Sequence, residues 1–166
     1  TGDWSGARHW NVKPDMMTCA KAITSAYYPF GATMIGEKVT DVFESDETGA
    51  ASIGHGYTYS AHPVGAAAAV ACLKETKRLK VNENAKIRGT QIFDAVFKLK
   101  EKYDIIGDVR GGHGLMTALE FVSDKASKTP LDNDSMAKIQ KTAYEHGAFV
   151  RVGGHNIMMS PPLIVT

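Results

Sequence analysis

The sequence has few of the features that mark metal centres or disulfide-stabilised proteins. Cys19 and Cys72 are the only cysteines among 166 residues, and neither belongs to a CxxC pair. The six histidines are scattered along the chain rather than paired one helical turn apart. Metal ligands usually occur at such short spacings, so the sequence predicts no metal site. The two cysteines are interpreted as small hydrophobic residues.

Charge of one sign and long apolar runs are also lacking. Nineteen Lys and Arg residues stand against eighteen Asp and Glu, a net charge of +1. This balance gives no electrostatic reason to expect a nucleic acid or an anionic membrane as partner. The alanine-rich stretch Ala66–Val70 falls far short of the ~20 apolar residues that cross a bilayer. No secretory signal is visible, although the chain opens on Thr1 rather than methionine, and the expected location is the cytoplasm.

Hydrophobic spacing and turn residues predict a mixture of strands and helices without an internal repeat. Predicted strands cover Met16–Ala20, Phe30–Ile35, Leu115–Val122 and two short stretches near the C-terminus. Predicted helices cover Glu37–Phe43, an alanine-rich segment that begins at Pro63, Asn84–Lys102 and Ser135–His146, with Gly147 as a stop. In the third helix an apolar face combines Ile92, Val96, Leu99 and Tyr103.

Lys21 stands in unusual surroundings for a lysine. It follows the small, apolar run Met16–Ala20, with turn residues before the run and again at Tyr28–Gly31. The pattern predicts a turn, a buried strand, the lysine and a loop. Burial would lower the lysine pKa and provide a free amine that can attack a carbonyl and form a Schiff base. From the run alone, a lysine that extends into water from a strand end is the alternative.

Four stretches of the sequence are informative together: Val12–Ala32, Gly54–Val64, Gly107–Met116 and Arg151–Leu163. They resemble stretches of class III aminotransferases, which use pyridoxal 5'-phosphate. Val12–Ala32 fits the pattern VxPDxxTxAKxxxxxYxPxGA of the segment that carries the Schiff-base lysine, with Asn11 in place of a preceding glycine. Gly54–Val64, reading GHGYTYSAHPV, is similar to the phosphate-binding stretch of the ω-amino acid:pyruvate branch. Gly107–Met116 and Arg151–Leu163 follow in the family's order. The resemblance therefore covers nearly all of the chain.

This resemblance implies an α/β chain with the fold of type I pyridoxal-phosphate-dependent transferases. Residues 1–79 would be the C-terminal part of the large cofactor-binding domain, and residues 80–166 a small α+β domain without its last helix. A parallel sheet needs neighbouring strands on both sides, yet only about two candidate strands precede Leu79. Both parts are expected to be incomplete, and the chain to be a C-terminal fragment.

The resemblance also assigns roles to four residues. Lys21 would hold pyridoxal 5'-phosphate as a Schiff base and shuttle a proton while an amino group moves from an ω-amino acid or amine to pyruvate or another oxo acid. Tyr57 and Thr58 would contact the phosphate bound to the neighbouring subunit's lysine, which implies a homodimer with shared active sites. Arg151 would bind the carboxylate of the oxo acid.

The residues alone leave structural alternatives open. Thr58 ahead of a helix N-terminus suits a phosphate, but a threonine can also satisfy its own loop backbone. Arg151 without the family pattern would be read as a surface residue. The glycine-rich stretch around Arg110 lacks the lysine and hydroxyl of a P-loop, so close packing explains it better. Asp15 is not the aspartate that pairs with the pyridine nitrogen, because in the family that residue lies upstream.

Three other functions remain open at this point. A non-catalytic fragment would lack the pyridine-facing aspartate and the ring-stacking residues, and unpaired polar groups in an incomplete site weaken cofactor binding. An aminomutase or decarboxylase of the same class would keep Lys21 and change mainly the substrate pocket. A binding module unrelated to pyridoxal phosphate would show no specific adduct at Lys21.

Overall fold

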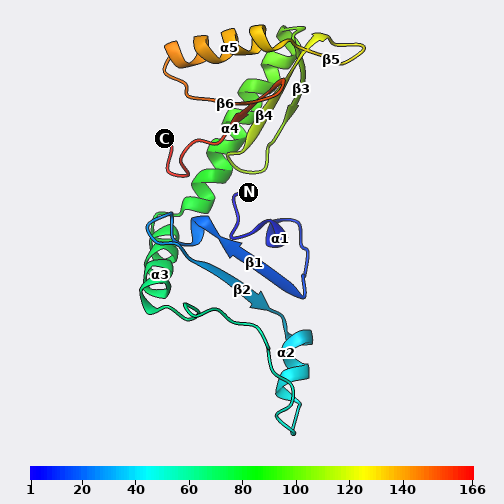
Figure 1. Cartoon of the computed structure of the whole chain (residues 1–166). Coiled ribbons are helices and arrows are strands. Elements are labelled where there is room, and N and C mark those ends of the chain that lie inside the picture. The colour runs from blue at the N-terminus through cyan, green and yellow to red at the C-terminus, as the bar shows by residue number, and fades with distance from the viewer. The chain divides into compact units, whose positions relative to one another are not determined.

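The computed structural model describes residues 1–166, which form two compact units (Figure 1). The first, here called the lysine unit, is Trp10–Lys80. The second, here called the sheet unit, joins Thr1–His9 to Val81–Thr166. The break between the units follows Lys80, next to the division predicted at Leu79, whereas the first nine residues belong with the C-terminal part. None of the helices combines the length and the apolar character needed to cross a membrane.

The lysine unit is built on a pair of antiparallel strands. β1 (Met16–Ala20) and β2 (Gly31–Ile35) run side by side, with Ala20 opposite Gly31. A single 3₁₀ turn, η1 (Lys21–Ile23), follows β1 directly. The helices α2 (Glu37–Glu44) and α3 (Pro63–Arg78) complete the unit and are joined by the long loop 45–62. The predicted start of α3 at Pro63 is confirmed. Proline suits this position because the first helical residue needs no backbone N–H donor.

The burial predicted for the first strand is not found within this chain. Residues of β1 alternate between exposed and half-buried, Met16 is 54% exposed, and Lys21 is exposed. The physical reason is that β1 pairs only with β2, in an antiparallel sheet of two strands. A strand is buried only when other elements cover both of its faces. The apolar composition therefore predicted the strand correctly but not its surroundings.

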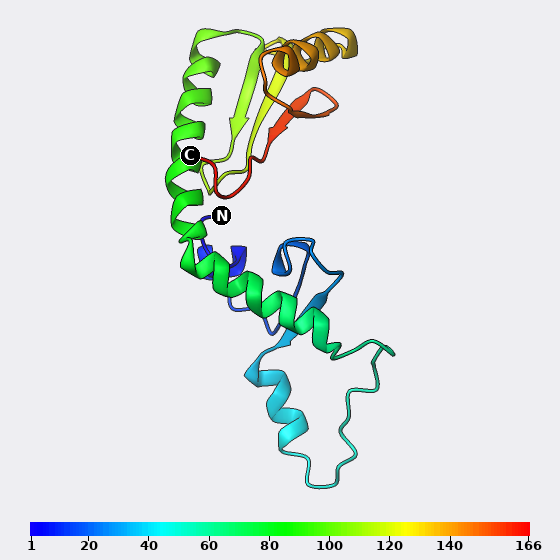
Figure 2. The same cartoon turned by 90° about the vertical axis from the view of Figure 1, so that its left-hand side faces the viewer.

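The sheet unit contains a five-stranded antiparallel sheet in the order β3-β4-β7-β6, with β5 paired to β4. Its strands are β3 (Ile106–Arg110), β4 (Thr117–Asp124), β5 (Thr129–Pro130), β6 (Arg151–Gly153) and β7 (Asn156–Met159). Its helices are α1 (Gly6–His9), α4 (Val81–Lys102) and α5 (Asn133–Glu145). Figure 2 shows the long green helix α4 running alongside the strands.

One face of this sheet forms the hydrophobic core with helices α4 and α5. The buried core residues are Ile106, Val109, Leu119, Phe121, Met136 and Ile157. Phe93 and Val96 of α4 and Ile139 of α5 pack against them. Of the apolar face predicted for the third helix, Val96 reaches the core, whereas Leu99 and Tyr103 are 38% and 43% exposed. The helix itself begins at Val81, earlier than the predicted Asn84.

Close backbone packing explains the glycine-rich stretch that precedes β4. A side chain on Gly89 of α4 would overlap the backbone carbonyl of Gly114. Gly112 and Gly114 adopt φ values of 81° and 77°, a left-handed conformation that favours glycine. The close approach of Gly89 and Gly114 supports the interpretation of this stretch as a packing element.

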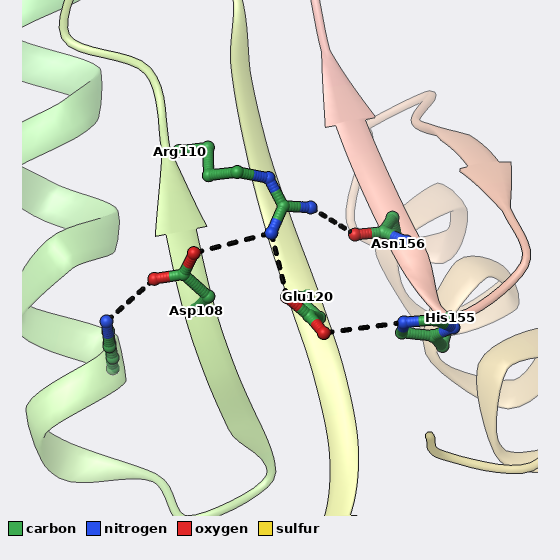
Figure 3. Close-up of polar contacts among 6 residues, drawn as sticks. Asp108, Arg110, Glu120, His155 and Asn156 are labelled. Atoms are coloured by element: carbon green, nitrogen blue, oxygen red, sulfur yellow. Dashed lines mark hydrogen bonds and ion pairs between the residues drawn. The ribbon is translucent and has the colours of Figure 1, made fainter. Parts of the chain in front are cut away.

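The opposite face of the sheet carries a polar network that crosses three strands (Figure 3). The guanidinium of Arg110 on β3 donates through Nη1 to Glu120 Oε2 at 2.7 Å and to Asp108 Oδ2 at 3.3 Å. Lys100 of α4 donates through Nζ to Asp108 at 2.8 Å. These contacts hold the pKa of Glu120 below its ordinary range, chiefly through Arg110, and that of Asp108 likewise, chiefly through Lys100.

We predict that Gly89→Ala destabilises the sheet unit. In an open helix interior this change usually adds ~1 kcal/mol of stability. Here the new methyl group meets the backbone of Gly114, and overpacking of this kind costs about 1 to 3 kcal/mol. Urea unfolding followed by circular dichroism should show a lower free energy of unfolding, whereas Thr90→Ala at the exposed neighbouring position should be close to neutral. A Gly89→Ala chain as stable as its parent would contradict the packing described here.

We also predict that acid weakens the sheet unit through Glu120 and Asp108. Both carboxyl groups bind protons less tightly in the folded than in the unfolded chain. Their contribution is therefore complete above the unfolded pKa values, and it is lost as the pH falls through the lowered folded values. Denaturant unfolding between about pH 6 and pH 3 should show this loss in the parent chain, and a shallower dependence in Arg110→Met. Equal pH dependence in both chains would contradict the prediction.

Candidate functional site

Lys21 occupies a sharp bend at the end of β1. Ala20 is extended, with φ −156° and ψ −161°, and Lys21 then adopts φ 54°, in the left-handed region. The side chain of Lys21 is exposed. A left-handed conformation costs a residue with a side chain about 1 to 2 kcal/mol, so the surrounding loop must hold it in place. Such strained positions are concentrated at functional sites.

The loop after Lys21 is fixed by a residue that the sequence did not point to. Thr24 is 1% exposed, its backbone N–H donates to the carbonyl of Lys21 at 3.2 Å, and its Oγ1 donates to the carbonyl of Tyr28 at 2.6 Å. From α3, Cys72 Sγ donates to the carbonyl of Ala22 at 3.5 Å. A lone threonine inside a predicted loop has no hydropathy signal, so only the three-dimensional contacts show its role.

Tyr57 and Thr58 lie in a tight turn of the loop that precedes α3. The backbone N–H of Tyr57 donates to Ser60 Oγ at 3.0 Å, and the backbone N–H of Ser60 donates to the carbonyl of Tyr57 at 2.9 Å. Tyr57 is 75% exposed, and Thr58 is exposed with a hydroxyl that makes no hydrogen bond. The turn is thus closed without the Thr58 side chain, whose hydroxyl remains available.

The N-terminus of α3 also has free hydrogen-bond donors. His62 occupies the N-cap position but its side chain caps no backbone N–H, and Pro63 has no N–H to offer. The backbone N–H groups of Val64 and Gly65 have no acceptor. Free amides and the positive end of the helix dipole together favour an anion at this position.

The lysine unit contains a hollow of about 700 Å³. It is lined on one side by residues 28–31 and on the other by the loop that carries Tyr57. Its wall consists mainly of aromatic and small residues: Tyr28, Pro29, Phe30, Gly31, Tyr57, Tyr59, Ser60, Ala61 and His62. The Tyr28 hydroxyl lies 3.4 Å from the ring nitrogens of His62. The structure therefore places Tyr57 against the residues that follow Lys21 along the chain. Lys21 and Thr58 do not line the hollow, and no hydrogen bond joins them.

Arg151, the fourth predicted site residue, belongs to the sheet unit. It is the first residue of β6, the edge strand, where it pairs with Met158 of β7. Its side chain is exposed and makes neither a hydrogen bond nor an ion pair with the rest of the chain. Lys21, Tyr57 and Thr58 lie in the lysine unit, and the structure describes each unit by itself. No cluster of three or more His, Cys, Asp or Glu side chains is arranged to hold a metal ion.

Comparison with known proteins gives matches over the whole chain. The family model described as aminotransferase class-III matches residues 1–166. An uncharacterized aminotransferase of Sinorhizobium fredii is 40% identical over 100% of this chain and 36% of its own length. The mitochondrial gamma-aminobutyrate transaminase 1 of Oryza sativa subsp. indica is 36% identical over 99% of this chain and 32% of its own length. The chain thus spans about a third of the length of these relatives.

Solved structures show the same relationship. An amine transaminase from an uncultivated Pseudomonas species, in its PLP-bound form, matches 99% of this chain and 37% of its own, with a TM-score of 0.89 and 40% identity. A thermostable (S)-enantioselective omega-transaminase from Thermomicrobium roseum matches with a TM-score of 0.86 and 33% identity, over 100% of this chain and 36% of its own. The predicted fold is confirmed by these matches, and the chain belongs to the class III aminotransferase family.

Proposed function

We propose that the chain is part of a pyridoxal-phosphate-dependent aminotransferase in which Lys21 binds the cofactor covalently. The observation that carries the proposal is the placement of Lys21, an exposed amine at a left-handed bend that Thr24 and Cys72 hold in place. A conformation that suits glycine is occupied by a lysine in the stretch that resembles the family's cofactor-binding segment. Because the chain spans about a third of its relatives, the activity of the whole protein is part of the proposal.

The residues present fit this cofactor chemically. The Nζ amine of Lys21 can condense with an aldehyde and release water, and its exposure leaves it accessible. Pyridoxal phosphate, when bound, supplies that aldehyde and an electron-withdrawing ring. The unpaired Thr58 hydroxyl and the free N–H groups of Val64 and Gly65 suit a phosphate. By resemblance Tyr57 and Thr58 serve the neighbouring subunit's cofactor, so we propose a homodimer with shared sites.

The remaining roles follow from the chemistry of each side chain. Lys21 Nζ, released from the cofactor when the substrate amine takes its place, would accept a proton from the substrate carbon and deliver it to the cofactor carbon. The unpaired guanidinium of Arg151 suits two-point binding of the carboxylate of pyruvate or another oxo acid. Relatives named gamma-aminobutyrate transaminase and omega-transaminase support an ω-amino acid or amine as the donor. The cytoplasmic location stays a prediction, since some relatives are named as mitochondrial or chloroplastic.

The covalent role of Lys21 can be tested on this chain directly. Added pyridoxal phosphate should give a visible absorption band, and borohydride reduction followed by peptide mass spectrometry should place the adduct on Lys21. Lys21→Ala should remove the band and the adduct. Lys80→Ala is the matched control, because Lys80 is also an exposed lysine of the lysine unit with a left-handed φ of 50°.

Two outcomes would contradict this proposal in different ways. Reduction onto many lysines in equal yield, with Lys21 no more reactive than Lys80, would mean that the bend does not select a cofactor lysine. A complete absence of adduct at any lysine would favour the alternative that the chain is a non-catalytic fragment. The observation that supports this alternative is that the chain spans only about a third of the length of its relatives.

The phosphate role of Thr58 has a separate test. Thr58→Val removes the hydroxyl but keeps the branched shape, and the loss of one hydrogen bond to an anion should raise the dissociation constant for pyridoxal phosphate by about tenfold. Thr58→Ser keeps the hydroxyl and should bind like the parent chain. Pyridoxal, which has no phosphate, should bind all three chains equally. A loss of pyridoxal binding in Thr58→Val would show that the change acts on the fold instead.

A further inference from the structure

The position of Arg151 depends on a short hairpin at the edge of the sheet. β6 pairs only with β7, and the two strands are joined by the turn Gly154–His155. Gly153 lies opposite Asn156, and Arg151 opposite Met158. Directly opposed residues of antiparallel strands project to the same face, so Arg151 and Asn156 share one face. Ile157, between Asn156 and Met158, points to the other face and into the core.

Side chains of β3 and β4 hold the turn end of this hairpin. Arg110 Nη2 donates to Asn156 Oδ1 at 2.6 Å, and His155 Nε2 lies 3.5 Å from Glu120 Oε1 (Figure 3). Next to them, the backbone N–H of Phe121 donates to the carbonyl of His155 at 2.8 Å. His155 in the turn and Asn156 at the start of β7 are therefore held by the polar network, in addition to the backbone pairing of β7 with β4.

The two arginines of this face have different surroundings. The Arg110 guanidinium is shared among Asp108, Glu120 and Asn156. Its pairing with Glu120 raises the pKa of Arg110 further, so that it remains charged across the physiological range. Arg151 has no such partner. The charge of Arg110 is thus used within the protein, whereas that of Arg151 is available to a ligand.

We propose that Arg110 and Asn156 are positioning residues, which fix the β6–β7 hairpin and thereby orient Arg151 toward the carboxylate of the oxo acid. This inference rests on the proposed function, in which Arg151 binds that carboxylate. The hairpin is short, with strands of three and four residues, so it has few backbone hydrogen bonds of its own. A displacement of about 1 Å in a substrate-binding group can cost about a hundredfold in rate, so an anchor of this kind affects binding.

The test compares two acceptors in the assembled enzyme. Asn156→Ala should lower kcat/KM for pyruvate by about tenfold, mainly through KM, because one strong hydrogen bond is lost. For propanal, an acceptor aldehyde without a carboxylate, kcat/KM should stay the same. Asn156→Asp keeps the Oδ1 acceptor for Arg110 and should restore the parent preference for pyruvate. Equal losses for both acceptors would mean a general structural role and would overturn the proposal.

Arg151→Ala separates this inference from the proposed function. If Arg151→Ala does not reduce the preference for pyruvate over propanal, the carboxylate role of Arg151 is wrong. If Arg151→Ala reduces it and Asn156→Ala does not, the positioning role is wrong and the proposed function stands.

A second readout needs neither cofactor nor turnover. In the 166-residue chain, Asn156→Ala should speed amide hydrogen exchange in β6 and β7 by about tenfold, because the anchor of the hairpin is lost. Exchange in β3 should remain at the parent rate. Unchanged exchange in β6 and β7 would show that Asn156 does not hold the hairpin and would overturn the proposal.

Discussion

The two-residue period of β4 is the constraint on which the sheet unit depends. β4 pairs with β3, β7 and β5, so all the remaining strands of this sheet except β6 lie directly against it. Its alternation puts Leu119 and Phe121 into the core and Glu120 between them on the polar face. A shift of one residue would exchange the two faces, burying Glu120 and exposing the core residues. The same alternation therefore secures both the hydrophobic packing and the network that reaches β7.

The lysine unit depends on different interactions from the sheet unit. Few of its residues are buried, and the contacts that define its central feature are hydrogen bonds to backbone carbonyls from Thr24 and Cys72. Those contacts fix a loop with left-handed residues at Lys21, Ser25 and Ala26. Hydrophobic packing sets the shape of the sheet unit, whereas local hydrogen bonding sets the bend that carries the proposed cofactor lysine.

Local signals in the sequence predicted the elements well and their surroundings poorly. Pro63 marked the start of α3 because proline suits the first helical position, and the apolar run before Lys21 marked β1. The exposure of β1 could not be predicted, because it depends on which elements cover the strand. The partners of Arg110 depend on the register of three strands, of which β7 is far from the other two in the sequence. Family membership was visible in four stretches, because such patterns need no knowledge of contacts, and the match over residues 1–166 confirms it.

The open N-terminus of α3 has a consequence for the energetics of the helix. An absent side-chain cap usually costs a helix about 1 kcal/mol, and here neither His62 nor Pro63 supplies one. An anion that accepted from Val64 and Gly65 would take the place of the cap. Any ligand that binds the folded helix but not the unfolded chain stabilises it by mass action. The strength of anion binding at this position and the added stability of the first turn of α3 would then be two measures of one free energy.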